Sequence, residues 1–355
     1  MFQNISKIII SLLLFALINL NSLRNLKNEK SYKDLFEPTK IGSIPVQNHF
    51  IRSATLEGFS INGGFPSQKI NEMYKNLSDG KIGLIITSFT RVADYEQSKE
   101  GQLAIYDDKF IPAYKEMTDL IHKTGTKIVM QIVHGSSSNN YTEKPFMLGP
   151  SSVVNPFTKK IPKEMTKKDI KNVVKLFADA ALRVKKSGFD GVQLHVAHGY
   201  LLSQFISPFF NKRRDEYGGS CENRVRIVSE IVKATREKVG KDFPIWVKIN
   251  SWDEMDNGKG LQIEEFLIMS QILSKDGVDV FEVSGLLAYK HPKCERAYYK
   301  EGAMKLSQLI NKPIICTGGL KEKSDIEDIY LNSNVDFFGF SRALLKNPAF
   351  IETLK

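Results

Sequence analysis

Two histidines, His195 and His198, lie three residues apart at the end of an apolar run, and Tyr200 follows. Histidines at this spacing can bind a metal, but the chain has no His-Glu-x-x-His motif and no obvious third ligand nearby in sequence, so we expect no metal. Paired imidazole N–H groups can instead donate hydrogen bonds to a ligand oxygen that gains negative charge. A phenol can then deliver a proton. We therefore interpret His195 and His198 as an oxygen-binding pair and Tyr200 as a proton donor; a structural role for the histidines is the alternative.

Other apolar runs also end in polar residues. Because burying an unpaired polar group costs about 1–3 kcal/mol, such residues need partners or a ligand. Gln131 carries an amide that both donates and accepts, which suits the edge of a heterocyclic ring. Lys248 lies inside an apolar run and needs an anionic partner, which a cofactor that becomes anionic on reduction would supply. For either residue, pairing inside the protein is the alternative. The full set is Ser88, Gln131, His134, His195, Lys248, Asn250, Ser284, Thr317 and Ser341.

The last two apolar runs carry the features of a phosphate site. One leads into Gly318-Gly319, and the other ends in Ser341-Arg342 before a short helix-like stretch. Glycines let backbone N–H groups approach an anion, and an arginine adds a forked cation. The two features together predict a phosphate-bearing ligand, with a plain turn and a surface arginine as the alternative.

The elements that must position these residues alternate regularly. Eight short apolar runs are separated by amphipathic, helix-like stretches, of which the clearest are 108–125, 167–188, 222–240 and 262–277. This alternation predicts an α/β fold, a (β/α)8 TIM barrel with its active site at the carboxyl ends of the strands. The rival is a doubly wound open sheet, but no G-x-G-x-x-G motif follows the first run. The runs are 49–55, 81–88, 127–134, 189–195, 244–250, 278–285, 312–319 and 335–342.

Composition excludes some classes of protein. The net charge of +10 is spread along the chain in short Lys/Arg pairs, so we expect no nucleic-acid partner. Cys221, Cys294 and Cys316 lie far apart, which fits neither a disulfide framework nor a zinc or iron–sulfur site. Their pattern favours a reducing, cytoplasmic location. The oligomeric state stays open, a homo-oligomer included.

The N-terminus favours a different location. Residues 7–20, KIIISLLLFALINL, resemble a signal peptide or a short membrane anchor, although the run is short for a full span. We therefore divide the chain into a hydrophobic N-terminal extension at 1–30 and a single barrel domain at 31–355. If the extension is functional, the protein is membrane-anchored or exported.

The stretch LHVAHGYLLSQFISPFFNKRRDEYGGSCENR at 194–224 resembles the signature of the Old Yellow Enzyme family of flavin-dependent ene-reductases. The similarity runs from LFEPTKIGSIPVQNHFIRSAT at residue 35 to FFGFSRALLKNPAF near the C-terminus. The resemblance implies a TIM barrel with non-covalent FMN. It further implies that NADH or NADPH reduces the flavin, which then reduces activated C=C bonds such as those of α,β-unsaturated carbonyls. The chain resembles the short form, without an iron–sulfur domain.

The resemblance also implies roles for individual residues. His195 and His198 would hold the oxygen of the unsaturated substrate, and Tyr200 would protonate the α-carbon of that substrate. Leu56 departs from the family, in which many relatives have Cys or Thr at this place, and Lys248 stands where many have Arg. The residues implied to bind FMN are Ser53, Ala54, Thr55, Leu56, Phe89, Gln131, Lys248, Gly318, Gly319, Ser341 and Arg342.

Two other functions stay open at this point. One is a TIM-barrel aldolase or isomerase that binds a phosphate-bearing ligand and uses Lys248 to form a Schiff base. The other is a non-catalytic flavin-binding protein, because leucine at position 56 cannot make the side-chain bond to the flavin that Cys or Thr makes.

Overall fold

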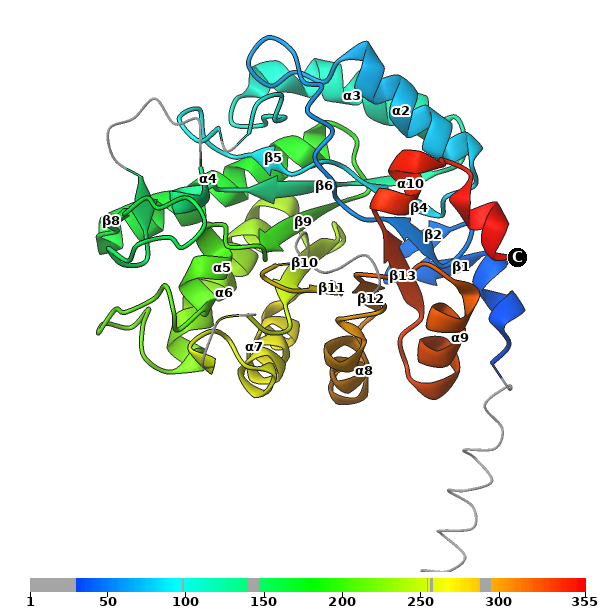
Figure 1. Cartoon of the computed structure of the whole chain (residues 1–355). Helices are drawn as coiled ribbons and strands as arrows, with labels where there is room; N and C mark the ends of the chain where they lie inside the picture. The colour runs from blue at the N-terminus through cyan, green and yellow to red at the C-terminus, as the bar shows by residue number, and fades with distance from the viewer. Residues whose placement is uncertain (1–29, 98, 140–146, 254, 256–257, 288–294) are drawn as a thin grey trace, which may run out of the picture.

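A closed barrel of parallel strands forms the centre of the molecule, with helices around it (Figure 1). The computed structural model describes residues 30–97, 99–139, 147–253, 255, 258–287 and 295–355. Pairing of β4 with β6 closes the ring of strands, which confirms the predicted (β/α)8 barrel and excludes the open sheet. Around the barrel the order is β4 (Leu84–Ile86), β3 (Phe50–Arg52), β13 (Phe337–Phe340), β12 (Ile314–Thr317), β11 (Val280–Ser284), β10 (Ile245–Asn250), β9 (Gly191–Val196) and β6 (Lys127–Val133).

The outer helices follow from amphipathic patterns and clear end signals. In α4 (Lys167–Lys186), Ile170, Phe177 and Val184 recur at helical spacing on the buried face, and Thr166 begins the helix with a capping box to Asp169. The other outer helices are α2 (Gln68–Asp79), α3 (Ile111–His122), α6 (Cys221–Val239), α7 (Ile263–Asp276), α8 (Lys300–Leu309) and α9 (Lys323–Asn332).

Shorter elements complete the chain. Two short helices, α5 (Leu201–Ile206) and α10 (Arg342–Lys346), follow β9 and β13, and β5 (Thr90–Arg91) extends the sheet beside β6. The pair β7 (Leu148–Gly149) and β8 (Lys163–Glu164) forms a separate two-stranded sheet. Single 3₁₀ turns lie at η1 (Tyr32–Phe36), η2 (Asp108–Phe110), η3 (Ser136–Ser138) and η5 (Phe350–Leu354).

A hairpin closes the amino-terminal end of the barrel. Strands β1 (Thr39–Ile41) and β2 (Ile44–Val46) pair antiparallel, and Ile41, Ile44 and Val46 belong to the same buried cluster as Trp246 and other residues inside the barrel. These apolar side chains fill the amino-terminal part of the barrel. This hairpin was not predicted from the sequence.

The N-terminal extension lies almost wholly outside the described residues. Lys30, which we assigned to the extension, contacts the barrel, because its Nζ donates to Asp336 Oδ1 at 2.8 Å and to the Ser333 carbonyl at 3.0 Å. Within the described ranges no helix is long and apolar enough to cross a membrane. The candidate anchor at 7–20 and Cys294 both fall outside those ranges. Cys221 and Cys316 are buried free thiols.

Candidate active site

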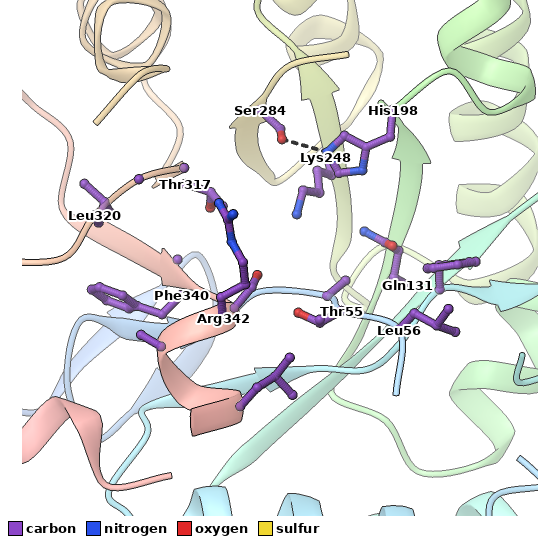
Figure 2. Close-up of a pocket in the computed structure, with 18 of the residues that line it drawn as sticks. Thr55, Leu56, Gln131, His198, Lys248, Ser284, Thr317, Leu320, Phe340 and Arg342 are labelled. Atoms are coloured by element: carbon purple, nitrogen blue, oxygen red, sulfur yellow. Dashed lines mark hydrogen bonds between the residues drawn. The ribbon is translucent and has the colours of Figure 1, made fainter. Parts of the chain in front are cut away.

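A cavity of about 1230 Å³ opens at the carboxyl ends of the strands. Every barrel strand, or the loop that follows it, contributes to its lining. Figure 2 shows Thr317, Leu320 and Phe340 on one side of this cavity and His198, Gln131 and Leu56 on the other. All the site residues expected from the sequence line the cavity except Ser53, and those that do are Ala54, Thr55, Leu56, Phe89, Gln131, His195, His198, Tyr200, Lys248, Gly318, Gly319, Ser341 and Arg342.

The glycine pair and Arg342 lie on one wall, because β12 and β13 are neighbours with Thr317 opposite Gly339. Gly318 and Gly319 both have positive φ angles, +113° and +71°. A Cβ on either glycine would lie within 2.6 Å of the Tyr298 ring, so no larger residue fits here. Arg342 donates a hydrogen bond to the Tyr298 hydroxyl at 2.9 Å. Tyr298, which lies against both features of the expected phosphate site, was not among the residues predicted from the sequence.

Four rings form the wall after β4 and β9. The His195 ring centroid lies 4.9 Å from those of both His198 and Tyr200, and Phe89 lies 5.3 Å from Tyr200. His198 has a positive φ of 61°, an uncommon conformation for a residue other than glycine. Its backbone N–H donates to Asn250 Oδ1 at 3.1 Å, and its Nε2 lies 2.9 Å from Ser284 Oγ (Figure 2). Asn250 and Ser284 therefore hold the histidine in place.

The two imidazoles are neutral. Burial, followed by the nearby His198 and Lys248, holds the pKa of His195 well below its usual value of 6.5. Burial, followed by Lys248, lowers the pKa of His198 to about 3. The Ala197 N–H donates to His195 Nδ1 at 3.3 Å, which makes Nδ1 the acceptor and puts the proton on Nε2. His195 can thus donate a hydrogen bond to a ligand oxygen through Nε2 without carrying charge.

A buried polar layer forms the cavity floor. Gln131, Lys248 and Thr317 line the cavity, and other members lie beneath them. We define the layer as Ser53, Gln131, Gln193, Lys248, Glu282 and Thr317. The ammonium of Lys248 lies 2.9 Å from Glu282 Oε1 and 2.7 Å from Ser53 Oγ. Lys248 therefore has an anionic partner inside the protein, which was the alternative to pairing with a cofactor. Its side chain also lines the cavity. Ser53, which we expected beside the ligand, belongs to this layer instead: its backbone N–H donates to Phe340 and its hydroxyl to Glu282.

Gln131 is also paired within the layer. Its Nε2 donates to Gln193 Oε1 at 2.7 Å, and Gln193 Nε2 donates to Glu282 Oε2 at 2.8 Å. Neither Gln193 nor Glu282 was among the site residues predicted from the sequence. Strand alternation could have indicated them, because Gln193 lies two residues before His195 and Glu282 two before Ser284, on the same face of each strand.

The second half of the 194–224 motif is structural. Buried Arg213 binds Asp215 and donates to the carbonyls of Pro150 and Met165 at 3.0 and 2.7 Å. Asn211 donates to the Phe205 and Tyr217 carbonyls. Buried arginine and asparagine side chains thus hold the long loop between α5 and α6.

The fold and the site together define a TIM-barrel protein with a ligand cavity at its carboxyl face. The chain belongs to the NADH:flavin oxidoreductase / NADH oxidase family, whose model matches residues 34–355. This confirms the resemblance inferred from the motif.

Individual relatives agree with this assignment. The chain is 33% identical to the NADH oxidase of Thermoanaerobacter brockii, over 89% of its own length and 50% of that protein. It is 32% identical to the NADPH dehydrogenase of Clostridium acetobutylicum, over 89% of its own length and 93% of that protein. Histamine dehydrogenase from Rhizobium sp. 4-9 superposes with a TM-score of 0.80 at 26% identity, over 91% of this chain and 48% of that one. The chain thus spans about half the length of the first and third of these relatives.

Proposed function

We propose that this protein is an FMN-dependent oxidoreductase that uses NADH or NADPH to reduce activated C=C bonds, such as those of α,β-unsaturated carbonyl compounds. The observation that carries the proposal is the neutral pair of His195 and His198 beside Tyr200, on the wall of a cavity whose floor carries Gln131 and Lys248. Family membership supports flavin chemistry and a nicotinamide donor.

The residues present fit FMN. Gln131 and Lys248 offer hydrogen-bonding groups to the edge of a ring, and the turn at Gly318-Gly319 with Arg342 offers a wall for the phosphate. Ala54, Thr55 and Leu56 form a largely apolar margin between them, which suits a planar ring. When bound, FMN would supply hydride transfer, and the protein would supply position and electrostatics.

The chain's own residues then have distinct tasks. The Nε2–H of His195 donates to the substrate's carbonyl oxygen, and His198 contacts the same oxygen from the adjoining turn. Two neutral donors draw electron density from the C=C bond, so the β-carbon becomes electrophilic. Tyr200 delivers a proton to the α-carbon. Because neither imidazole is charged, neither is the favoured proton source.

The structure offers no support for the aldolase or isomerase alternative. A lysine that forms a Schiff base must present a free amine, whereas the Lys248 ammonium is bound by Glu282 and Ser53. The test is direct. We expect the purified protein to be yellow, to release FMN on heating, and to oxidise NADH or NADPH in the presence of cyclohexenone. A colourless protein that borohydride inactivates with substrate would contradict the proposal, and a yellow protein without activity would favour a non-catalytic flavin protein.

We also infer a reducing, cytoplasmic location from the odd number and wide spacing of the cysteines, of which Cys221 and Cys316 are buried free thiols. If the hydrophobic segment at 7–20 is functional, the protein is instead membrane-anchored or exported. Fractionation of cells that express the full chain tests this inference. Recovery of the protein with the membranes or the exported fraction would contradict it.

A further inference from the structure

Glu282 is the centre of the buried polar layer, although it does not itself line the cavity. It is fully buried, and four side chains point hydrogen-bond donors at its carboxylate. Oε1 accepts from Ser53 Oγ, from Thr317 Oγ1 at 2.9 Å and from Lys248 Nζ at 2.9 Å. Oε2 accepts from Gln193 Nε2 at 2.8 Å. The function assigned to the cavity above makes no use of this carboxylate.

These partners require Glu282 to be ionised. An ammonium and an amide NH₂ can only donate, so Lys248 and Gln193 need acceptors on both carboxylate oxygens. Burial alone raises the pKa of Glu282, but the charge of Lys248 and the hydrogen bonds from Ser53, Lys248 and Gln193 outweigh it and leave that pKa lowered. The Lys248–Glu282 pair therefore adds no net charge to the cavity floor.

The same carboxylate fixes the direction of the amide chain. Because Glu282 only accepts, Gln193 must turn its NH₂ toward Glu282 and its carbonyl oxygen toward Gln131. Gln131 must then donate its NH₂ to Gln193. This leaves the Gln131 carbonyl oxygen as the acceptor that it can offer to a ligand, which suits an N–H donor on a ring edge.

We propose that Glu282 is a positioning residue that sets the charge and the hydrogen-bond direction of the cavity floor, and thereby the relative affinity of the site for oxidised and reduced FMN. This inference rests on the proposed function. A reduced flavin carries negative charge, which an unpaired Lys248 would stabilise more strongly than a Lys248 neutralised by Glu282. Glu282 would hold the reduction potential of the bound flavin lower than Lys248 alone would set it.

The test compares reduction potentials of the FMN-loaded protein and its variants. We expect Glu282→Gln to bind reduced FMN at least about tenfold more tightly relative to oxidised FMN, which raises the two-electron potential by about 30 mV. Lys248→Met should lower the potential by at least as much. The matched control is Thr317→Val, which removes one hydrogen bond to Glu282 but no charge, and should change the potential by less than half as much.

The double variant Lys248→Met/Glu282→Gln keeps the test decisive if Glu282→Gln alone does not fold. It removes both charges, so its potential should return close to that of the unmodified protein and above that of Lys248→Met. Equal shifts in potential for Glu282→Gln and Thr317→Val would overturn the proposal. So would a double variant whose potential equals that of Lys248→Met. Failure of the unmodified protein to bind FMN would be seen first, in its visible spectrum, and would instead overturn the proposed function.

Discussion

At the scale of single residues, the conformation of His198 depends on two neighbours from other strands. Its left-handed backbone costs about 1–3 kcal/mol unless the surroundings compensate. Asn250 of β10 accepts from its backbone, and Ser284 of β11 bonds to its ring. Ser284 therefore fixes which ring nitrogen faces away from the ligand, a role that does not require contact with the substrate.

We expect Ser284→Ala to weaken the binding of phenol, an analogue of the substrate oxygen, by about five- to tenfold, which corresponds to about 1 kcal/mol for one lost hydrogen bond. The measurement is titration of the long-wavelength charge-transfer band of the phenol–flavin complex. The control is Ser270→Ala in α7, where the buried hydroxyl has no hydrogen-bond partner among the described residues. Equal affinities for the two variants would show that Ser284 does not orient His198.

The neutral histidines also predict the pH dependence of ligand binding. A lowered pKa means that His198 remains neutral until the pH falls toward about 3. The pKa of His195 is also lowered, so this imidazole is neutral as well at ordinary pH. Phenol affinity should therefore show no histidine titration between about pH 5 and pH 8. An inflection near the ordinary histidine pKa of 6.5 would indicate that one imidazole is protonated in the site.

At the scale of elements, a buried ion pair joins the loops that frame the cavity. Arg52 at the end of β3 binds Glu57, and the side chains are only 2% and 1% exposed. The Tyr74 hydroxyl of α2 donates to Glu57 at 2.9 Å and accepts from the Ser88 backbone N–H at 2.9 Å. This network connects the loop after β3, helix α2 and the loop after β4, which carries Phe89.

We expect Glu57→Ala to destabilise the fold by about 3–5 kcal/mol, because it leaves Arg52 buried without its anionic partner. The control is Asp79→Ala, which breaks the exposed Lys75–Asp79 pair on the same helix and should cost only about 0.3–0.5 kcal/mol. Urea unfolding of both variants provides the comparison. Similar midpoints would mean that the buried pair does not stabilise the loops.

The barrel strands could be predicted because both of their faces are buried, which leaves short apolar runs between helical patterns. The hairpin β1–β2 could not, since two strands of three residues leave too little periodicity. Glu282, like Lys248, lies inside an otherwise apolar run, but only the pairing of β10 with β11 shows that the two charges lie opposite each other. His195, His198 and Tyr200 were found because the order and spacing of the motif point to them, whereas the partners of Lys248 and Gln131 depend on which strands become neighbours.

At the scale of the whole molecule, the described residues begin at Lys30, whose ammonium already bonds to the barrel. We expect a chain of residues 30–355 to unfold in one cooperative transition and to bind FMN in the same molar ratio as the full chain. Calorimetry and flavin absorbance measure these two properties. A second transition in the shorter chain, or a lower flavin content in it than in the full chain, would contradict the division into an extension and a single barrel domain.

The hairpin β1–β2 has a consequence for kinetics, because it leaves the carboxyl face as the way into the barrel. Under the proposed function, the nicotinamide nucleotide and the unsaturated compound must then pass one entrance and occupy one place, each in its turn. Double-reciprocal plots of the initial rate should give parallel lines. An excess of either reactant should inhibit the reaction by competing with the other for the site. The closure of the amino-terminal end of the barrel would thus appear in the kinetics as alternate binding of the two reactants at one site.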